Sequence, residues 1–256
     1  DLDGALDLSA ADVAALCDRR YGVGGDGILR VVRAAADPET ADVPDAPEFF
    51  MDYRNADGSF AEMCGNGVRV FVRYLVEAGL ATNGGVTVLT RAGPVEARAG
   101  ADEVTVRLAR PRVGEASTAL VERAAQTGEK LELPGLAVDC GNPHLVCPLP
   151  GDVELAALDL TRPPTVDPAR FPAGVNVEFV SPLAADHVRM RVYERGSGET
   201  LSCGTGALAV AAATLHRAGE RAGTVTVDVP GGRLRVGLTE HGATLAGPAV
   251  VVARGT

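Results

Sequence analysis

The chain has 256 residues, 46% apolar and 23% charged, which suits a soluble globular protein with a sizeable buried core. Its 34 Asp and Glu residues outnumber 24 Lys and Arg residues, and the absence of a basic run argues against binding to nucleic acid or to anionic membranes. The longest apolar stretch, around 207–215, is far shorter than the roughly 20 residues that cross a bilayer. Five cysteines, an odd number in a chain this long, favour a reducing cytoplasm over a disulfide scaffold.

The first predicted elements are a helix within 9–20, capped by Ser9, and a strand at 28–32. Between them, Gly22, Gly24 and Gly27 have the spacing of a dinucleotide-binding fingerprint. A helix precedes these glycines and a strand follows them, the reverse of the order that such a site requires. We therefore expect no nucleotide there. The Pro- and acid-rich stretch 34–48 predicts a solvated loop that leads to a strand at 49–53.

A helix is predicted directly after Cys64. Its apolar positions recur at helical spacing, which predicts one buried stripe, and Gly79 marks its end; the stripe is Val68, Phe71, Val72, Leu75 and Val76. A second helix, at 206–215, is apolar on nearly all sides, which indicates a helix wrapped by strands. Alternating segments predict the remaining strands at 86–90, 103–108, 175–180, 188–193 and 225–229. We expect 110–136 to be the crossover between two halves.

The sequence repeats itself weakly at an offset of 139 residues. At this offset Cys-Gly-Asn-Gly (64–67) falls on Cys-Gly-Thr-Gly (203–206), and two Val-Thr-Val segments coincide, at 86–88 and 225–227. The repeat predicts an α/β (α+β) fold of two pseudosymmetric halves, each a curved, mostly antiparallel sheet or barrel around a central helix. We place the halves at 1–110 and 111–246, with a terminal strand at 247–256 that returns to the first half.

The repeated cysteines predict the chemistry. A cysteine at a helix N-terminus meets free backbone N–H groups and the positive end of the helix dipole, which favour its thiolate. Two such thiols, one per half, suggest a pair that faces across a cleft. A base on one side of a carbon and an acid on the other side perform racemisation or epimerisation, and helix N-terminal N–H groups can stabilise the charge that develops on a substrate carboxylate.

Four separated segments then resemble one family. They are Asn-Ala-Asp-Gly-Ser-Phe-Ala-Glu-Met-Cys-Gly-Asn-Gly-Val-Arg (55–69), Gly-Asn-Pro-His (141–144), Gly-Val-Asn-Val-Glu-Phe-Val (174–180) and Tyr-Glu-Arg-Gly-Ser-Gly-Glu-Thr-Leu-Ser-Cys-Gly-Thr-Gly-Ala (193–207). Their order along the chain resembles diaminopimelate epimerase, which interconverts LL- and meso-diaminopimelate in the biosynthesis of lysine and peptidoglycan precursors. The resemblance implies a cytoplasmic homodimer that uses neither pyridoxal phosphate nor a metal ion.

The resemblance also implies roles for individual residues. Cys64 and Cys203 would be base and acid, with Glu194 and His144 beside them as further catalytic residues. The substrate, a small amino acid, would be bound by Asn55, Gly65, Asn66, Asn142, Asn176, Glu194, Arg195, Gly204 and Thr205. The family begins with a strand that this chain lacks before Asp1, so we expect an incomplete front end, and Gly27 stands where many members carry a Gln that contacts substrate.

The other cysteines are expected to be structural. Cys17 has helical spacing from Val13 and is interpreted as an inert core thiol. Cys140, His144 and Cys147 match no common zinc spacing, so no metal site is predicted. Two other functions remain as alternatives. One is a proline-type racemase of the same architecture, which Asn66 and the Glu194-Arg195 pair disfavour. The other is a thiol redox or binding protein, although the chain has no Cys-x-x-Cys.

Overall fold

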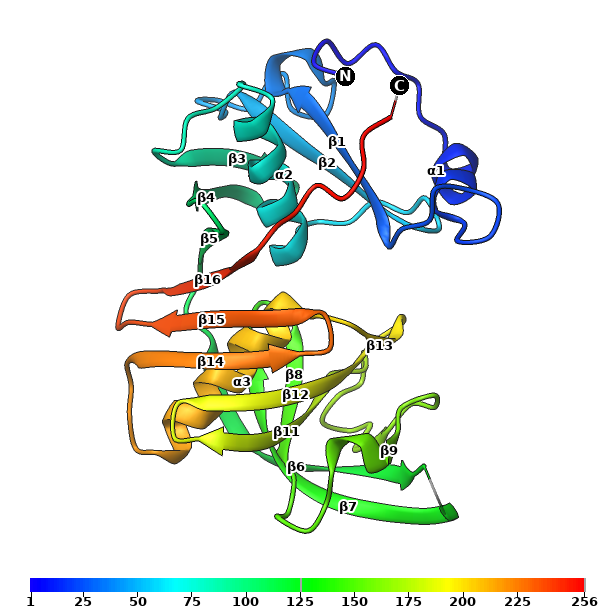
Figure 1. The fold of residues 1–256 in the computed structure, drawn as a ribbon, viewed down its shortest axis with the longest axis vertical. Helices are drawn as coiled ribbons and strands as arrows, with labels where there is room; N and C mark the ends of the chain where they lie inside the picture. Colours follow the sequence, from blue (N-terminus) through cyan, green and yellow to red (C-terminus); the bar gives the residue numbers. More distant parts are fainter. Residues whose placement is uncertain (125, 256) are drawn as a thin grey trace. The chain divides into compact units, whose positions relative to one another are not determined.

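In the computed structural model, which describes residues 1–124 and 126–255, the chain folds into two compact units (Figure 1). Unit 1 comprises Asp1–Arg107 and the segment that starts at Ala249, and unit 2 comprises Leu108–Pro248. The mixed α+β class predicted from the sequence is confirmed, because most elements are strands. None of the helices in the described part of the chain is long and apolar enough to cross a bilayer.

Unit 1 is a sheet of five strands with two α-helices. The strands follow the order β1-β2-β3-β4-β5, in which only the β2–β3 pair is parallel. The elements are α1 (Ala10–Cys17), β1 (Gly27–Arg33), the 3₁₀ turn η1 (Ala34–Ala36), β2 (Phe49–Asn55), α2 (Gly65–Glu77), β3 (Val86–Thr90), β4 (Gly93–Ala99) and β5 (Glu103–Leu108). Ser9 caps α1 through a reciprocal hydrogen-bonded box with Asp12, as the sequence predicted.

Unit 2 is a larger sheet that surrounds α3 (Gly204–Arg217). Its strand order is β16-β15-β14-β12-β11-β8-β7-β6-β10, with β13 beside β12 and β9 beside β6. These strands are β6 (Arg112–Arg123), β7 (Gln126–Asp139), β8 (Pro143–Pro148), β9 (Leu158–Asp159), β10 (Thr165–Val166), β11 (Asn176–Ala184), β12 (His187–Glu194), β13 (Gly198–Thr200), β14 (Gly223–Val229), β15 (Gly232–Leu238) and β16 (Ala243–Pro248), and a 3₁₀ turn, η2 (Leu155–Ala157), precedes β9.

The internal repeat is visible in the topology. In unit 1 the series β1-β2-β3-β4-β5 pairs antiparallel, parallel, antiparallel and antiparallel. In unit 2 the series β11-β12-β14-β15-β16 pairs in the same order: antiparallel, parallel, antiparallel and antiparallel. The cysteine-capped helix lies between the second and third strand of each series, α2 in the first and α3 in the second. Each unit therefore presents one cysteine at an equivalent place in the same motif.

The two helices are buried to different extents, as their sequences predicted. On α2 the apolar stripe is buried at Val68, Phe71, Val72 and Leu75, whereas Val70 and Tyr74 on the opposite side are exposed. On α3 the run Ala207–Ala213 is buried on every side, because strands from β6 to β16 pack around it. The hydrophobic stripe fixes the rotation of α2, and so fixes where its first turn points.

Two segments differ from the sequence prediction. The stretch 110–136 does not form a crossover: most of it forms the hairpin of β6 and β7 in unit 2. The terminal strand expected at 247–256 is also not observed, because β16 ends at Pro248, which lacks the N–H that a ladder needs, and residues 249–255 are irregular. This tail belongs to unit 1 and runs past α2 (Figure 1). Arg73 Nε donates to Ala249 O, and Arg254 pairs with Glu77.

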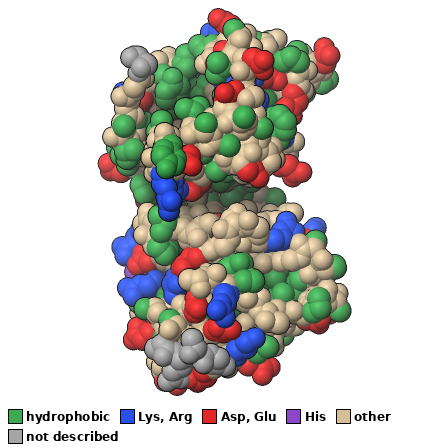
Figure 2. Space-filling view, turned by 90° about the vertical axis from the view of Figure 1, so that its right-hand side faces the viewer, with side chains coloured by type: hydrophobic (Ala, Val, Ile, Leu, Met, Phe, Trp, Pro, Cys, Tyr) green, Lys and Arg blue, Asp and Glu red, His purple; other side chains and the backbone are tan. Residues whose placement is uncertain are grey.

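The surface drawn in Figure 2 carries Lys and Arg side chains interspersed with Asp and Glu. No large basic patch gathers on that face. Exposed ion pairs occur in both units, such as Arg107 with Glu96 and Arg112 with Asp139. Exposed pairs of this kind contribute little to stability.

Candidate active site

The first cysteine environment lies in unit 1, at the start of α2. Cys64 is the N-cap residue, with extended backbone angles, and its Sγ accepts a hydrogen bond from the Gly67 N–H at 3.4 Å. A sulfur atom therefore fills the position where Ser or Asp usually caps a helix. Gly65 and Gly67 are buried and bring the backbone close to the sulfur.

A buried cation lies behind Cys64. Arg69 is 5% exposed, and its guanidinium Nη1 donates to Gly65 O at 3.3 Å. Burial lowers the pKa of Arg69, and the negative charge of a Cys64 thiolate acts to raise it. Because an Arg pKa starts above about 12, the group stays charged at neutral pH. Among the described residues, Arg69 Nε has no hydrogen-bond partner.

The predicted substrate residue Asn55 ends β2 in the same unit. Its Nδ2 donates to Ser59 Oγ at 3.0 Å, so the amide is oriented by the turn that follows the strand. Asn66 is half-buried in the first turn of α2. Unit 1 thus brings Cys64, Gly65 and Asn66 together at one helix N-terminus.

The second cysteine environment lies in unit 2, at the start of α3. Cys203 is the N-cap residue, and its Sγ accepts from the Gly206 N–H at 3.4 Å. Thr205 Oγ1 lies 3.6 Å from the same sulfur. This arrangement reproduces the cap of α2 with a more deeply buried sulfur, since Cys203 is only 5% exposed.

Burial raises the pKa of the Cys203 thiol well above its ordinary value, and the carboxylates of Glu194 and Glu178 act in the same direction. The hydrogen bonds from Thr205 and from the Gly206 N–H lower the pKa but do not outweigh these effects. A helix N-terminus alone predicts a lowered pKa, so the expectation of a favoured thiolate is wrong for Cys203 in this structure. These surroundings favour the thiol form of Cys203, which suits a proton donor.

A chain of hydrogen bonds connects Cys203 to a buried carboxylate. From Thr205 Oγ1 it runs to Asn142 Nδ2 at 3.5 Å, and from Asn142 Oδ1 to His144 Nε2 at 3.0 Å. His144 Nδ1 then lies 2.7 Å from Glu178 Oε1, and both side chains are fully buried. Because an amide oxygen only accepts, Nε2 carries a proton and the imidazole faces Glu178 with its other nitrogen.

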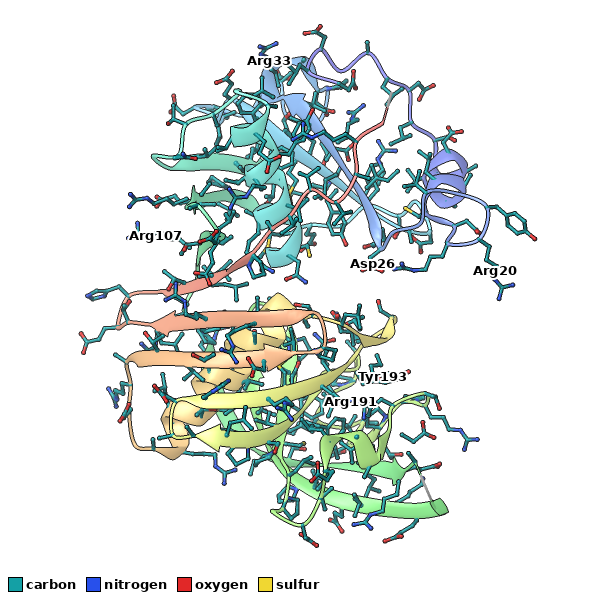
Figure 3. The ribbon with its side chains drawn as sticks, in the orientation of Figure 1. Arg20, Asp26, Arg33, Arg107, Arg191 and Tyr193 are labelled. Carbon is teal, nitrogen blue, oxygen red and sulfur yellow. The ribbon has the colours of Figure 1, made fainter. Side chains whose placement is uncertain are left out.

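Glu194 and the Asn176–Arg195 pair lie at the ends of β12 and β11. Glu194 Oε1 accepts a short hydrogen bond from Thr200 Oγ1, and Asn176 Oδ1 accepts from the Arg195 N–H at 2.9 Å. The position of β12 is fixed by Arg191, labelled beside Tyr193 in Figure 3, which pairs with Glu199 and donates to the Leu155 and Leu158 carbonyls. The bonds from Thr200 and from the Arg195 N–H orient the Glu194 and Asn176 side chains, which the sequence nominated as site residues.

The remaining cysteines have structural surroundings. All five cysteines are free. Burial raises the pKa of Cys147 to about 12, and raises that of Cys140 further; Cys140 Sγ donates to Thr205 O at 3.5 Å. Cys17, the last residue of α1, is buried, with 6% of its surface exposed. Within 1–124 and 126–255, no cluster of three His, Cys, Asp or Glu side chains could hold a metal ion.

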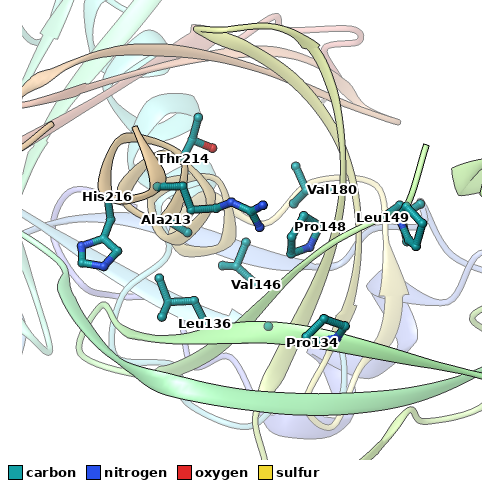
Figure 4. Close-up of a pocket in the computed structure, with 12 residues that line it drawn as sticks. Pro134, Leu136, Val146, Pro148, Leu149, Val180, Ala213, Thr214 and His216 are labelled. Atoms are coloured by element: carbon teal, nitrogen blue, oxygen red, sulfur yellow. The ribbon is translucent and has the colours of Figure 1, made fainter. Parts of the chain in front are cut away.

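A separate cavity of about 470 Å³ opens in unit 2 (Figure 4). Its lining is mostly apolar and includes Leu136, Val146, Pro148 and Val180, together with the last turns of α3 at Ala213–Arg217. Because the helix rises 1.5 Å per residue, these turns lie about 15 Å along the axis from Cys203. The cavity is therefore at the far end of α3 and does not belong to the cysteine site.

Sequence reasoning missed Glu178 and Arg69. Both lie inside segments that carry the family resemblance, 174–180 and 55–69. Nothing in the sequence indicated that Glu178, a strand residue between a valine and a phenylalanine, or Arg69, a basic helix residue, would be buried. One signal could have found Arg69. The 139-residue repeat places Leu208, an apolar residue, opposite Arg69, and a charge at a position that is apolar in the other copy of a repeat merits attention.

Comparison with known proteins identifies the family. The sequence model described as diaminopimelate epimerase matches residues 1–114 and 136–255. A diaminopimelate epimerase of Streptomyces coelicolor is 50% identical over 266 residues, which cover 100% of this chain and 89% of that protein. One from Mycolicibacterium smegmatis is 48% identical over 270 residues, covering 100% of this chain and 90% of that protein.

A solved structure supports the fold. The phenazine biosynthesis protein of the PhzF family from Bacillus anthracis has a TM-score of 0.69 with 18% identity, covering 99% of this chain and 89% of that one. At this identity the likeness concerns the fold alone. The match of the family model and the near 50% identity of full-length relatives are decisive: the chain belongs to the diaminopimelate epimerase family.

Proposed function

We propose that this protein is a diaminopimelate epimerase that interconverts the LL and meso forms, with Cys64 and Cys203 as the two acid–base groups. One thiolate takes the α-proton and becomes a thiol, while the electron pair left on the α-carbon is delocalised into the carboxylate. The other thiol gives its proton to the opposite face of that carbon and becomes a thiolate. The reverse reaction exchanges the two roles.

The observation that carries this proposal is the repeated cap. In each unit a cysteine sulfur accepts the N–H of the third helix residue at 3.4 Å, so two thiols occupy equivalent positions in equivalent motifs. A two-base reaction requires two such groups, whereas a one-base reaction does not explain the duplication. Family membership names the substrate class.

The helix N-termini are suited to bind the carboxylate of the reacting centre. Backbone N–H groups in the first turns of α2 and α3, from Gly65-Asn66 and Gly204-Thr205, can donate to it and stabilise the charge that develops there. Asn55, Asn142, Asn176, Glu194 and Arg195 would bind the remaining polar groups of the substrate. Two amino-carboxylate ends require this many donors and acceptors.

The proposal places the enzyme in the cytoplasm, in lysine and peptidoglycan precursor biosynthesis, as a homodimer that needs no cofactor. Five free cysteines fit a reducing compartment. Light scattering coupled to size-exclusion chromatography tests the homodimer: a mass near twice 26.3 kDa supports it, and a mass of one chain contradicts it.

Turnover in heavy water tests the reaction. Epimerisation of LL- or meso-diaminopimelate should place solvent deuterium at the α-carbon of the product, because the acid exchanges its proton with solvent. Product without deuterium would refute the two-base scheme, and turnover of proline instead would assign the protein to the racemase class.

Variants test the assignment of the two thiols. Cys64→Ala and Cys203→Ala should each abolish epimerisation, since removing either group leaves the reaction without its base or its acid. Cys17→Ala is the matched control and should retain activity. Retained epimerisation in either of the first two variants would show that another group performs that proton transfer.

A further inference from the structure

The internal repeat allows the surroundings of the two cysteines to be compared position by position. Cys64 and Cys203 are 139 residues apart, and so are Tyr53 on β2 and Val192 on β12. Across their ladders, Tyr53 pairs with Leu29 of β1, and Val192 pairs with Glu178 of β11. Leu29 and Glu178 therefore occupy equivalent positions.

These two side chains reach the same place beside the helix N-termini. A Cβ atom on Gly67 would lie 3.3 Å from Leu29 Cδ2 and 3.4 Å from Cys64 Cβ. A Cβ atom on Gly206 would lie 2.8 Å from Glu178 Oε1 and 3.3 Å from Cys203 Sγ. Where the first cysteine has a methyl group as its neighbour, the second has a carboxylate oxygen.

At a second pair of equivalent positions the two units also differ by a charge, and here the charge is positive and lies in unit 1. Arg69 and Leu208 are also 139 residues apart, at the same position of α2 and α3. Both are buried, but Arg69 brings a guanidinium to the backbone of Gly65, the residue after Cys64. A buried cation with an unpartnered Nε–H is costly unless an anion lies nearby, and Cys64 can supply that anion.

A third exchange strengthens the contrast. Asn55 and Glu194 stand at the same offset, at the ends of β2 and β12. The acidic groups of the described residues that face Cys203 are thus Glu178 from β11 and Glu194 from β12, and His144 from β8 lies 2.7 Å from Glu178. At Cys64 the equivalent positions supply a leucine and a neutral amide, and α2 supplies a cation.

We infer that these exchanges set the resting charges: before substrate binds, Cys64 is the thiolate and Cys203 the thiol, with Arg69 and Glu178 as the positioning residues that fix this order. The inference rests on the proposed function for its meaning. The substrate form whose α-proton faces Cys64 meets a base at once. The other form must wait until a proton has moved from Cys203 to Cys64.

A thiolate titration tests this order without substrate. Thiolate ultraviolet absorbance is recorded against pH for the full-length protein and for Cys64→Ser and Cys203→Ser. Near neutral pH, Cys64→Ser should lose the absorbance of one thiolate, and Cys203→Ser should lose none. Loss in Cys203→Ser alone, or equal loss in both, would overturn the inference.

Variants of the positioning residues test the cause. Arg69→Met should raise the pH midpoint of the Cys64 titration by about one unit or more, because it removes a nearby opposite charge. Arg69→Lys should restore most of that shift. Arg73→Met is the matched control, since Arg73 is equally buried on α2 but bonds to the Ala249 carbonyl, and it should leave the midpoint unchanged.

The variant Glu178→Gln provides a second, independent test of the inference. It removes the carboxylate charge but keeps the side-chain shape, so the midpoint of Cys203 should fall by a similar amount. Unchanged midpoints in both Arg69→Met and Glu178→Gln, with native circular dichroism, would refute the inference. None of these titrations depends on turnover. If the titrations gave the expected midpoints but the protein did not epimerise diaminopimelate, the proposed function would be rejected and the inference about the resting charges would stand.

Discussion

A methyl group added at the start of α3 is expected to destabilise unit 2, while the same change at the start of α2 is tolerated. Gly206 and Gly67 occupy equivalent positions in the two helices, and neither has a positive φ, so the comparison is purely steric. A Cβ on Gly206 would lie 2.8 Å from Glu178 Oε1, too close for contact. On Gly67 the nearest atom would be a leucine methyl carbon at 3.3 Å.

The expected loss of stability in Gly206→Ala follows from the displacement of Glu178 that the added methyl group requires. Glu178 is fully buried and Oε1 is held by His144 at 2.7 Å, so relieving the clash breaks that hydrogen bond. Overpacking costs about 1–3 kcal/mol and a broken buried hydrogen bond about 1–3 kcal/mol, while alanine in a helix returns about 1 kcal/mol. These ranges sum to about 1–5 kcal/mol, and from the middle of this range we expect Gly206→Ala to lose about 2–4 kcal/mol, whereas Gly67→Ala should stay within about 1 kcal/mol of the parent.

Differential scanning calorimetry measures both variants against the parent. A loss of 2–4 kcal/mol in a unit of this size lowers its transition by about 5–10 °C. Gly206→Ala should show this fall and Gly67→Ala should not. Equal melting temperatures for the two variants would refute the reasoning, because they would mean that Glu178 is free to move away from the first turn of α3.

Two further predictions concern unit 1. Asp52 is almost fully buried; burial raises its pKa, but hydrogen bonds from Arg91 and Arg54 outweigh this and hold the pKa below its ordinary value. A folded pKa below the unfolded value means that these ion pairs stabilise the fold above about pH 4 and that their contribution is lost as pH falls through the lowered folded pKa. Asp52→Asn should thus cost about 3–5 kcal/mol by urea unfolding at pH 7 and much less near pH 2; an equal loss at both pH values would contradict the ion-pair explanation. Ser9→Ala removes the cap of α1 and should cost about 1 kcal/mol in the same assay, whereas no measurable loss would mean that the capping box does not stabilise unit 1.

The fold was predictable where local patterns agree with tertiary packing. The stripe from Val68 to Leu75 specifies burial through helical period, the apolar run of α3 specifies burial on all sides, and the strand at 225–229 alternates as its sheet requires. The hairpin of β6 and β7 was not predicted. Strand β6 is exposed along most of its first half, at Arg112, Gly114, Glu115 and Ala116, so burial does not impose a clear period on its sequence.

The candidate site was predictable only in part. The two cysteines could be found from the sequence because the motif Cys-Gly-x-Gly occurs twice, and a repeated motif is detected when the sequence is compared with itself. Glu178 and Arg69 each occur once, and what matters about them is burial beside a sulfur, which sequence spacing does not reveal. The Glu178–His144 pair joins strands 34 residues apart along the chain and is created by the β8–β11 ladder.

A two-base reaction explains why a repeated fold should depart from its own repeat at these positions. Two identical thiols in identical surroundings would hold one proton with no preference between them, and two neutral or two charged thiols could not start the reaction. Charges of opposite sign, each at a position that is apolar in the other unit, remove that ambiguity while the shared motif keeps the two sulfur atoms in equivalent caps. In a duplicated enzyme of this kind, the matching residues mark the chemistry that both halves perform, and the mismatched buried charges mark which half begins it.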